Sequence, residues 1–329
     1  MADRRTRTVI VGGGRGEPVA LGGDNPIAIQ TMWKDPLTRE GLCGAAGDTL
    51  IARINALAAS GARLLRFAVP TLDDAALVGE LAGMVTLPLV ADIHFDYKIA
   101  LRALDYPIAK LRINPGNIGA KEHVVQVLDK AAAHNVPVRI GVNAGSIPAD
   151  LRKRIAAGEI DRVQALVEAA LRELDVFARE NFDAVLVSLK ASSVSETIAA
   201  NRLFAQHTDI PLHIGVTEAG PLVAGLVRST AALYTLLLEN IGDTVRVSLS
   251  DTAENEVIAA REIIAAVYEC LPDADNRCKG MTGIRIVSCP RCGRCAFDTH
   301  AFTARWISRL YALEKEATIA IMGCAVNGP

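Results

Sequence analysis

Aromatic residues are scarce in this sequence, where Phe, Trp and Tyr together make up 4% of 329 residues. That scarcity argues against an aromatic-rich β-sandwich. No apolar run approaches the roughly 20 residues that a membrane-spanning helix requires. The first residues carry charges without an apolar stretch behind them, so they do not form a signal peptide. We therefore expect a cytoplasmic protein without a membrane partner.

A strong net charge is also missing, because 35 Lys and Arg residues stand against 37 Asp and Glu residues, for a formal net charge of −2. Proteins that bind nucleic acid through bulk electrostatics need an excess of positive charge to neutralise phosphates. We therefore expect no nucleic-acid partner. What the sequence does contain is apolar, since 50% of its residues are hydrophobic. This composition suits a parallel sheet that is covered by helices.

Short β-branched segments alternate with amphipathic, Ala- and Leu-rich segments almost from end to end of the chain. Such alternation is typical of parallel strands joined by right-handed helical crossovers. Eight strand-like segments favour an α/β fold of the closed (β/α)₈ TIM-type barrel class over an open doubly wound sheet. The candidate strands begin at Ile27, Ala62, Pro88, Ala109, Pro137, Ala184, Pro211 and Thr244.

Helical periodicity ends near Cys270, where a stretch rich in Pro, Asp, Asn and Gly begins. We predict a barrel domain over 1–270, a linker over 271–280 and a small second domain over 281–329. The second domain is expected to be α+β, because a strand, a cysteine-rich loop, a helix and another strand follow one another there. A unit of this size has a marginal core unless a metal or a partner supports it.

Polar residues occupy the late positions of the candidate strands, where barrel enzymes place their chemistry. Side chains two residues apart in a strand share a face. Since Val, Ile or Leu mostly stand between the polar residues, we expect the polar set to point into the barrel. Its pairs are Asp92 and His94, Arg112 and Asn114, Arg139 and Asn143, Ser188 and Lys190, and Arg246 and Ser248; Arg66 has the corresponding position in the second strand, and Glu218 follows the seventh.

The cations of this set outnumber its carboxylates, Asp92 and Glu218. Converging cations repel one another unless carboxylates or an anionic ligand compensate them. The surplus predicts a multiply charged anion as ligand, and the planar fork of arginine suits phosphate oxygens. Two alternatives stay open. One or two arginines face outward to helix carboxylates, or Lys190 serves as a Schiff-base nucleophile instead of a phosphate contact.

Four of the seven cysteines lie near the end of the sequence, namely Cys289, Cys292, Cys295 and Cys324. In a reducing compartment, clustered cysteines more often bind metal than form disulfides. C-x₂-C-x₂-C with a distant fourth cysteine can hold an iron–sulfur cluster or a zinc ion, and the spacing leaves both open. Cys43 and Cys270 stand among apolar neighbours and are predicted to be inert core thiols.

Several longer motifs occur in a fixed order over nearly the whole chain. They are GGDNPIAIQTM, PLVADIHFDYKIAL, KLRINPGNIG, VRIGVNAGS, VSLKAS, PLHIGVTEAG, IGDTVRVSLS, SCPRCGR and IMGCAVNGP. Together they resemble the family of 4-hydroxy-3-methylbut-2-enyl diphosphate synthases, from the methylerythritol phosphate route to isoprenoids. The resemblance implies a barrel followed by a ferredoxin-like iron–sulfur domain, with a [4Fe–4S] cluster on Cys289, Cys292 and Cys324.

The resemblance also implies a reaction, the two-electron reductive ring opening of 2-C-methyl-D-erythritol 2,4-cyclodiphosphate. It implies a head-to-tail homodimer that receives electrons from flavodoxin or ferredoxin. Glu218, Asp92 and His94 are then candidates for proton transfer to the departing hydroxyl. The candidate substrate-binding residues are Arg66, Arg112, Asn114, Arg139, Asn143, Lys190, Arg246 and Ser248.

Two departures from the family pattern concern the cluster. The pattern continues past NGP with Gly-Glu, whose glutamate is the fourth cluster ligand, whereas this sequence stops at Pro329. We therefore expect an incomplete cluster domain. Cys295 is not one of the family's ligands. Two rival hypotheses stay open, a Schiff-base lyase with Lys190 as nucleophile and structural zinc on the cysteines, and a non-catalytic barrel that binds the cyclodiphosphate.

Overall fold

The computed structural model describes residues 4–271, 277, 284–290, 292–313, 315 and 317–324. Its main sheet consists of β3 (Ala28–Met32), β4 (Ala62–Ala68), β5 (Leu89–Asp92), β6 (Lys110–Ile113), β7 (Val138–Asn143), β8 (Val185–Lys190), β9 (His213–Ile214) and β10 (Thr244–Val245). All neighbours are parallel, in the order β8-β7-β6-β5-β4-β3-β10-β9. A parallel bridge between Val187 of β8 and Leu212 closes the sheet. The predicted (β/α)₈ barrel is confirmed.

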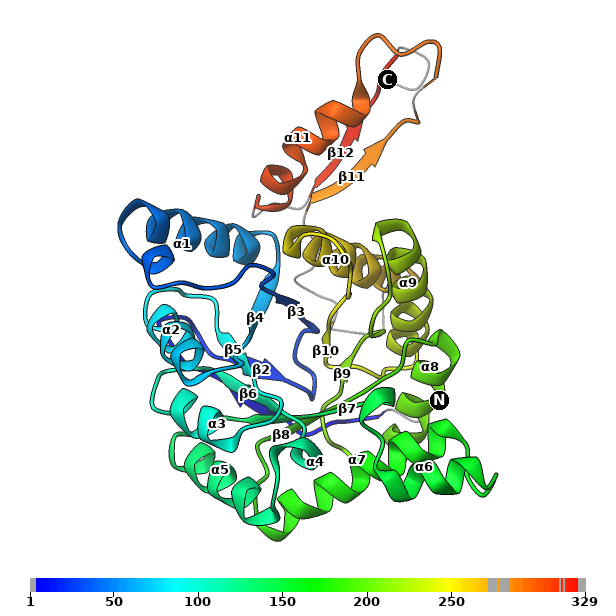
Figure 1. Cartoon of the computed structure of the whole chain (residues 1–329). Coiled ribbons are helices and arrows are strands. Elements are labelled where there is room, and N and C mark those ends of the chain that lie inside the picture. Colours follow the sequence, from blue (N-terminus) through cyan, green and yellow to red (C-terminus); the bar gives the residue numbers. More distant parts are fainter. Residues whose placement is uncertain are drawn as a thin grey trace.

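Helices form the outer ring of the barrel (Figure 1). Several of them begin where a side-chain oxygen accepts a hydrogen bond from the first turn, as Thr71, Asp161 and Thr252 do. The helices are α1 (Gly44–Ala59), α2 (Leu72–Ala82), α3 (Tyr97–Ala103), α4 (Pro115–Ile118), α5 (Lys121–Ala133), α6 (Ala149–Ala156), α7 (Arg162–Arg179), α8 (Val194–Ala205), α9 (Leu222–Leu238) and α10 (Ala253–Cys270), with short 3₁₀ helices η1 (Glu40–Leu42) and η2 (Ala144–Ser146).

An antiparallel hairpin of β1 (Val9–Val11) and β2 (Val19–Leu21) closes the amino end of the barrel. Its buried side chains pack in one apolar cluster with Leu64, Val90 and Leu186 from the barrel strands. The hairpin was not predicted from the sequence, because its strands are only three residues long. With this end filled by apolar side chains, the opposite end of the barrel is left for chemistry.

The small C-terminal unit contains the parallel strands β11 (Ile284–Ser288) and β12 (Ala317–Ile321) and the helix α11 (Thr299–Tyr311), in the predicted order. It contacts α10, where the Arg261 guanidinium stacks at 4.7 Å over the Tyr311 ring and donates to the Tyr311 carbonyl at 2.9 Å. From there the unit projects away from the barrel (Figure 1). The predicted linker over 271–280 lies outside the described residues, apart from Leu271 and Arg277.

Within the described part of the chain, no helix combines the length and the apolar character that crossing a membrane would demand.

Candidate active site

A polar pocket of about 160 Å³ lies at the carboxyl ends of the barrel strands, and we call it the mouth pocket. Of the polar barrel residues that the sequence analysis expected to point inward, all but two line this pocket. The exceptions are Asn114 and Glu218. The lining residues are Arg66, Asp92, His94, Arg112, Arg139, Val142, Asn143, Ser188, Lys190, Val216, Thr217, Arg246 and Ser248.

Asp92, at the end of β5, is the carboxylate at the centre of the mouth pocket. Its Oδ1 atom lies 3.0 Å from Arg112 Nη1, and its Oδ2 atom lies 3.5 Å from Arg66 Nε and from His94 Nε2. Burial raises the pKa of Asp92, but Arg66, His94 and Arg112 outweigh it and hold that pKa far below its usual range. An ionised Asp92 has no proton to donate, so its geometry suits a counter-ion that orients the two arginines.

Gly141 leaves the space that the Arg112 guanidinium occupies. A Cβ atom on Gly141 would lie 2.3 Å from Arg112 Nε and 2.6 Å from Nη2, which is closer than van der Waals contact allows. At Gly215 an added Cβ would lie 2.4 Å from the Arg246 carbonyl oxygen and 3.0 Å from Lys190 Nζ. Gly141 therefore fixes where the Arg112 guanidinium can lie, and Gly215 permits the close approach of the Arg246 backbone.

Glu256 of α10 is a second counter-ion, and the sequence analysis did not find it. Arg246 donates to both of its oxygens, at 3.2 Å from Nε and 3.0 Å from Nη2. Lys34 Nζ lies 2.6 Å from Oε1, and Thr31 Oγ1 donates to Oε2 at 2.9 Å. Burial raises the pKa of Glu256, but Arg246 and Lys34 lower it further than burial raises it. The carboxylate is therefore ionised and holds Arg246 in place.

The positive charge of the mouth pocket still exceeds its negative charge, because two carboxylates face four arginines and Lys190. Burial, followed by neighbouring cations, lowers the pKa of Arg66 to about 10, although Asp92 opposes this shift. Burial and the neighbouring arginines also lower the pKa of Arg139 and of Lys190 well below their ordinary values. An anionic ligand would relieve this repulsion, so the pocket is built for an anion.

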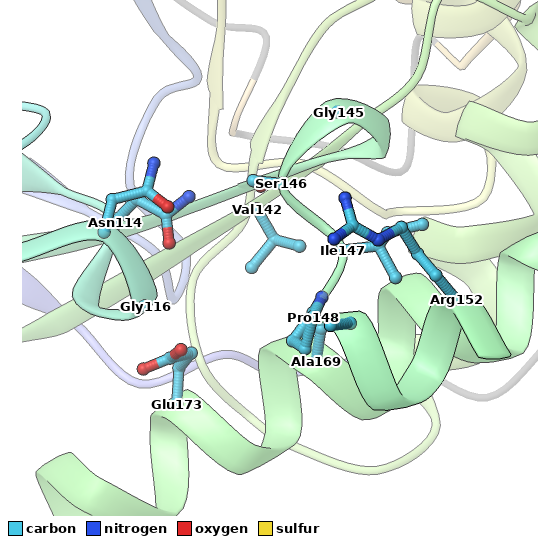
Figure 2. A pocket seen from close by; sticks show the side chains of 12 residues that line it. Asn114, Gly116, Val142, Gly145, Ser146, Ile147, Pro148, Arg152, Ala169 and Glu173 are labelled. Atoms are coloured by element: carbon cyan, nitrogen blue, oxygen red, sulfur yellow. The ribbon is translucent and has the colours of Figure 1, made fainter. Parts of the chain in front are cut away.

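Asn114 faces a different cavity, of about 410 Å³, beside the mouth pocket. Strand β6 ends at Ile113 and Asn114 is the N-cap of α4, so strand alternation no longer sets the direction of its side chain. Figure 2 shows Asn114 and Glu173 on one side of this cavity and Arg152 on the other. Burial raises the pKa of Glu173, an effect that a hydrogen bond from the Gly116 backbone partly offsets.

Glu218 lies at the rim of the barrel, in the loop after β9. Its side chain is exposed, and only its predecessor Thr217 lines the mouth pocket. Its φ of 51° is uncommon for a residue other than glycine, and such backbone strain is frequent in functional loops. His94 is also partly open to solvent, with 44% of its side chain exposed. Both side chains are therefore accessible to water.

The cysteine loop, which carries Cys289, Cys292 and Cys295, contacts the carboxyl end of β12. The Cys289 backbone donates to the Ile321 carbonyl at 3.1 Å, and the Gly323 backbone donates to Cys289 Sγ at 3.1 Å. Cys324 follows Gly323 in the chain, so its backbone adjoins a residue that contacts Cys289. Cys295 Sγ is near as well, 2.6 Å from where a Cβ on Gly323 would lie. In the described residues no three His, Cys, Asp or Glu side chains are grouped so that they could hold one metal ion.

The other two cysteines differ from their prediction. Cys43 and Cys270 are both exposed, so the prediction of inert core thiols is wrong. Cys43 precedes the first residue of α1, and Cys270 is the last residue of α10. Apolar neighbours in the sequence indicated burial, but helix ends lie at the barrel surface.

The fold and the mouth pocket define a class of protein, a (β/α)₈-barrel enzyme for a small polyanion that carries an additional cysteine-containing unit. Comparison with known families gives the same two parts. The GcpE TIM-barrel domain matches residues 6–261, and the GcpE protein C-terminal domain matches residues 285–329. The chain belongs to the GcpE family.

Similar proteins match nearly the whole chain. One from Treponema pallidum (strain Nichols) is 51% identical over 333 residues, which cover 99% of this chain and 79% of that protein. One from Treponema denticola is 48% identical, covering 98% of this chain and 84% of that protein. One from Thermodesulfovibrio yellowstonii is 40% identical, covering 99% and 86%. All three are named 4-hydroxy-3-methylbut-2-en-1-yl diphosphate synthase (flavodoxin), in agreement with the resemblance seen in the motifs.

Proposed function

We propose that the protein catalyses the two-electron reductive ring opening of 2-C-methyl-D-erythritol 2,4-cyclodiphosphate to 4-hydroxy-3-methylbut-2-enyl diphosphate, a step of isoprenoid biosynthesis. The observation that carries this proposal is the surplus of buried cations in the mouth pocket. The family and the shared name of its relatives support it. A cyclic diphosphate brings two negative charges, which compensate part of that surplus.

The proposed binding mode follows from the geometry of the mouth pocket. Arginines contact phosphoryl oxygens through their planar forks, and Lys190 adds a point charge. Asp92 and Glu256 keep the forks of Arg112 and Arg246 aimed before substrate arrives, which lowers the ordering cost of binding. The proposed phosphate contacts are Arg66, Arg112, Arg139, Lys190 and Arg246, and Asn143 and Ser248 orient the substrate. Asn114 faces the neighbouring cavity, so we leave it out of these contacts.

Proton transfer to the departing hydroxyl is proposed for His94 or Glu218. His94 lies within hydrogen-bonding distance of Arg112, at 2.8 Å between Nε2 and Nη1, and lines the mouth pocket. Glu218 lies one residue beyond Thr217, at the rim. Both are open to solvent, from which a donor regains its proton after each turnover.

We propose a [4Fe–4S] cluster on Cys289, Cys292 and Cys324, in a domain over 281–329 that follows the barrel domain over 1–270 and a linker over 271–280. Thiolates are the usual protein ligands of such clusters, and N–H donors to their sulfurs tune the reduction potential. The hydrogen bond from Gly323 to Cys289 Sγ has this character. A cluster bound there would supply the two electrons of the reaction one at a time.

The proposed partners follow from the same arrangement. The relatives' names include flavodoxin, and we propose flavodoxin or ferredoxin as the electron donor. We also propose a head-to-tail homodimer, because the cysteine loop lies at the end of the small unit that is remote from its own barrel (Figure 1). The mouth pocket of a second copy would then receive it. The cytoplasmic location stays a prediction from the sequence.

Anaerobic purification tests the proposal. The protein should contain iron and sulfide, absorb in the visible range, and convert the cyclodiphosphate when reduced flavodoxin is supplied. The lyase hypothesis is not favoured by the relatives' names, although a lowered lysine pKa would also suit a Schiff-base nucleophile. Zinc without iron, together with an adduct on Lys190 that borohydride traps, would replace the present proposal by that hypothesis.

A further inference from the structure

A second polar layer lies inside the barrel beneath the mouth pocket. Lys110 stands two residues before Arg112 on β6, shares its inward face, and has no exposed surface. Arg139 of β7 and His213 of β9 are buried beside it, at 1% and 0% exposed. Gln30 of β3, also 1% exposed, shares the face of Met32, whose sulfur contacts Arg66. We call Gln30, Lys110, Arg139 and His213 the inner layer.

The inner layer contains polar atoms without hydrogen-bond partners among the residues that the structure describes. These atoms are Lys110 Nζ, both amide atoms of Gln30, Nε2 of His213, and Nε and Nη1 of Arg139. The other His213 nitrogen, Nδ1, lies 3.3 Å from Thr244 Oγ1. Buried polar groups of native proteins nearly always have a partner, so a positive charge on Lys110 has no compensating contact among the described residues.

The charges that face Lys110 are almost all positive. Arg139 and Arg66 are its strongest electrostatic neighbours. Lys190 of β8 and Lys110 both act electrostatically on His213, so Lys190 adds a further positive charge to this region. Asp92 on β5, the carboxylate of the mouth pocket, is already paired with Arg66 and Arg112. Burial, followed by Arg139 and Arg66, lowers the pKa of Lys110 well below its ordinary value. Burial likewise lowers the pKa of His213.

We propose that Lys110 regulates the charge of the substrate site: it is an uncharged amine while the mouth pocket is empty, and it takes up one proton from solvent when a cyclic diphosphate binds. This inference rests on the proposed function. The uncharged amine lets the empty barrel tolerate its arginines, because one cation fewer has to be buried without a partner. Two phosphoryl charges at the mouth lower the positive potential around Lys110, so the ammonium form costs less than in the empty barrel and its charge strengthens binding.

Lys110 does not line the mouth pocket, so it acts on the ligand through its charge and through its neighbour Arg139. It is therefore a positioning residue, and the decisive quantity is the number of protons taken up on binding. A purely structural lysine would leave that number unchanged when it is replaced. Binding that takes up a proton also weakens as the pH rises, by up to tenfold in Kd per pH unit.

The test is isothermal titration of the whole chain with the cyclodiphosphate, without reductant, in buffers of different ionisation enthalpy between about pH 7 and 9, below the ordinary lysine pKa. Each phosphoryl group of this ligand has one ester and one anhydride linkage and keeps a single charge over that range, so any proton taken up binds to the protein. We expect close to one proton per bound ligand for the wild type and close to none for Lys110→Met. Lys121→Met, at an exposed position at the start of α5, is the control and should behave as the wild type does.

Each outcome of this titration supports or overturns the proposed role of Lys110. Uptake that persists in Lys110→Met places the proton on His213 or Lys190 and overturns the role of Lys110. Saturable wild-type binding without uptake, or with a Kd that does not change with pH, overturns it as well, and these wild-type measurements hold even if the variant fails to fold. If the cyclodiphosphate does not bind to the wild type at all, the proposed function fails first and this inference fails with it.

Discussion

The contact between Gly141 and Arg112 yields the sharpest prediction about substrate binding. In Gly141→Ala the new methyl group would lie 2.3 Å from Arg112 Nε, 2.6 Å from Nη2 and 2.8 Å from Cζ, so the guanidinium must leave its place. It would then lose its 3.0 Å contact with Asp92 and its aim at the ligand. A hydrogen bond to a charged group contributes about 1.5–3 kcal/mol. The cyclodiphosphate Kd should therefore rise roughly 10- to 150-fold.

Calorimetric titration measures this change, and a double-mutant cycle assigns it to Arg112. In an Arg112→Ala background, Gly141→Ala should have little further effect, because the group that it displaces is already absent. Gly83→Ala is the matched control, since Gly83 ends α2 with a φ of −74° and an added Cβ would meet only the Glu80 carbonyl at 3.4 Å. Unchanged binding by Gly141→Ala, or an equal loss in both backgrounds, would refute the reasoning.

Three further predictions follow from buried and interface contacts. Glu256→Gln removes the charge that holds Arg246 and Lys34. Breaking such a buried pair should lower the free energy of unfolding, measured with urea at neutral pH, by about 3 kcal/mol. An unchanged free energy of unfolding would contradict the pairing. Folding lowers the pKa of Asp92, so the ionised carboxylate stabilises the folded protein fully above the unfolded pKa of about 4, and this stabilisation is lost as the pH falls further. The urea midpoint of Asp92→Asn should therefore change less with pH below about 5 than that of the wild type. Arg261→Ala removes the stacking on Tyr311, so limited proteolysis should separate the small unit from the barrel faster than in the wild type, and an unchanged cleavage rate would show that other contacts hold it.

Strand alternation explains why so much of the mouth pocket was predictable. In β6 the polar residues recur at every second position, and in β7 Arg139 and Asn143 share one face with Gly141 between them; the parallel sheet brings their late positions to one rim. Lys110 obeys the same rule, two residues before Arg112, but it lies before the carboxyl end of β6 and was not among the predicted site residues. The sequence does mark Lys110, because a lysine between the apolar residues Ala109 and Leu111 is unusual at the start of a buried strand.

The sequence rule failed where a strand had ended or where a helix supplied the partner. Asn114 follows the last residue of β6, so the chain is already turning into α4 and its side chain faces the neighbouring cavity. Glu254 and Glu256 both lie in the first turn of α10. The sequence does not distinguish them, but in the structure Glu256 binds Arg246 and Glu254 binds Arg53. Long-range contacts of this kind leave no periodic pattern in the sequence.

A crystal structure of the whole chain with bound cyclodiphosphate tests the central claim most directly, because a second cavity, beside Asn114, adjoins the mouth pocket at Val142. We predict density for both phosphoryl groups in the mouth pocket, with oxygens within hydrogen-bonding distance of Arg66, Arg112 and Arg246. Ligand density in the cavity beside Asn114 and Glu173 instead, with the mouth pocket holding only water, would contradict the account.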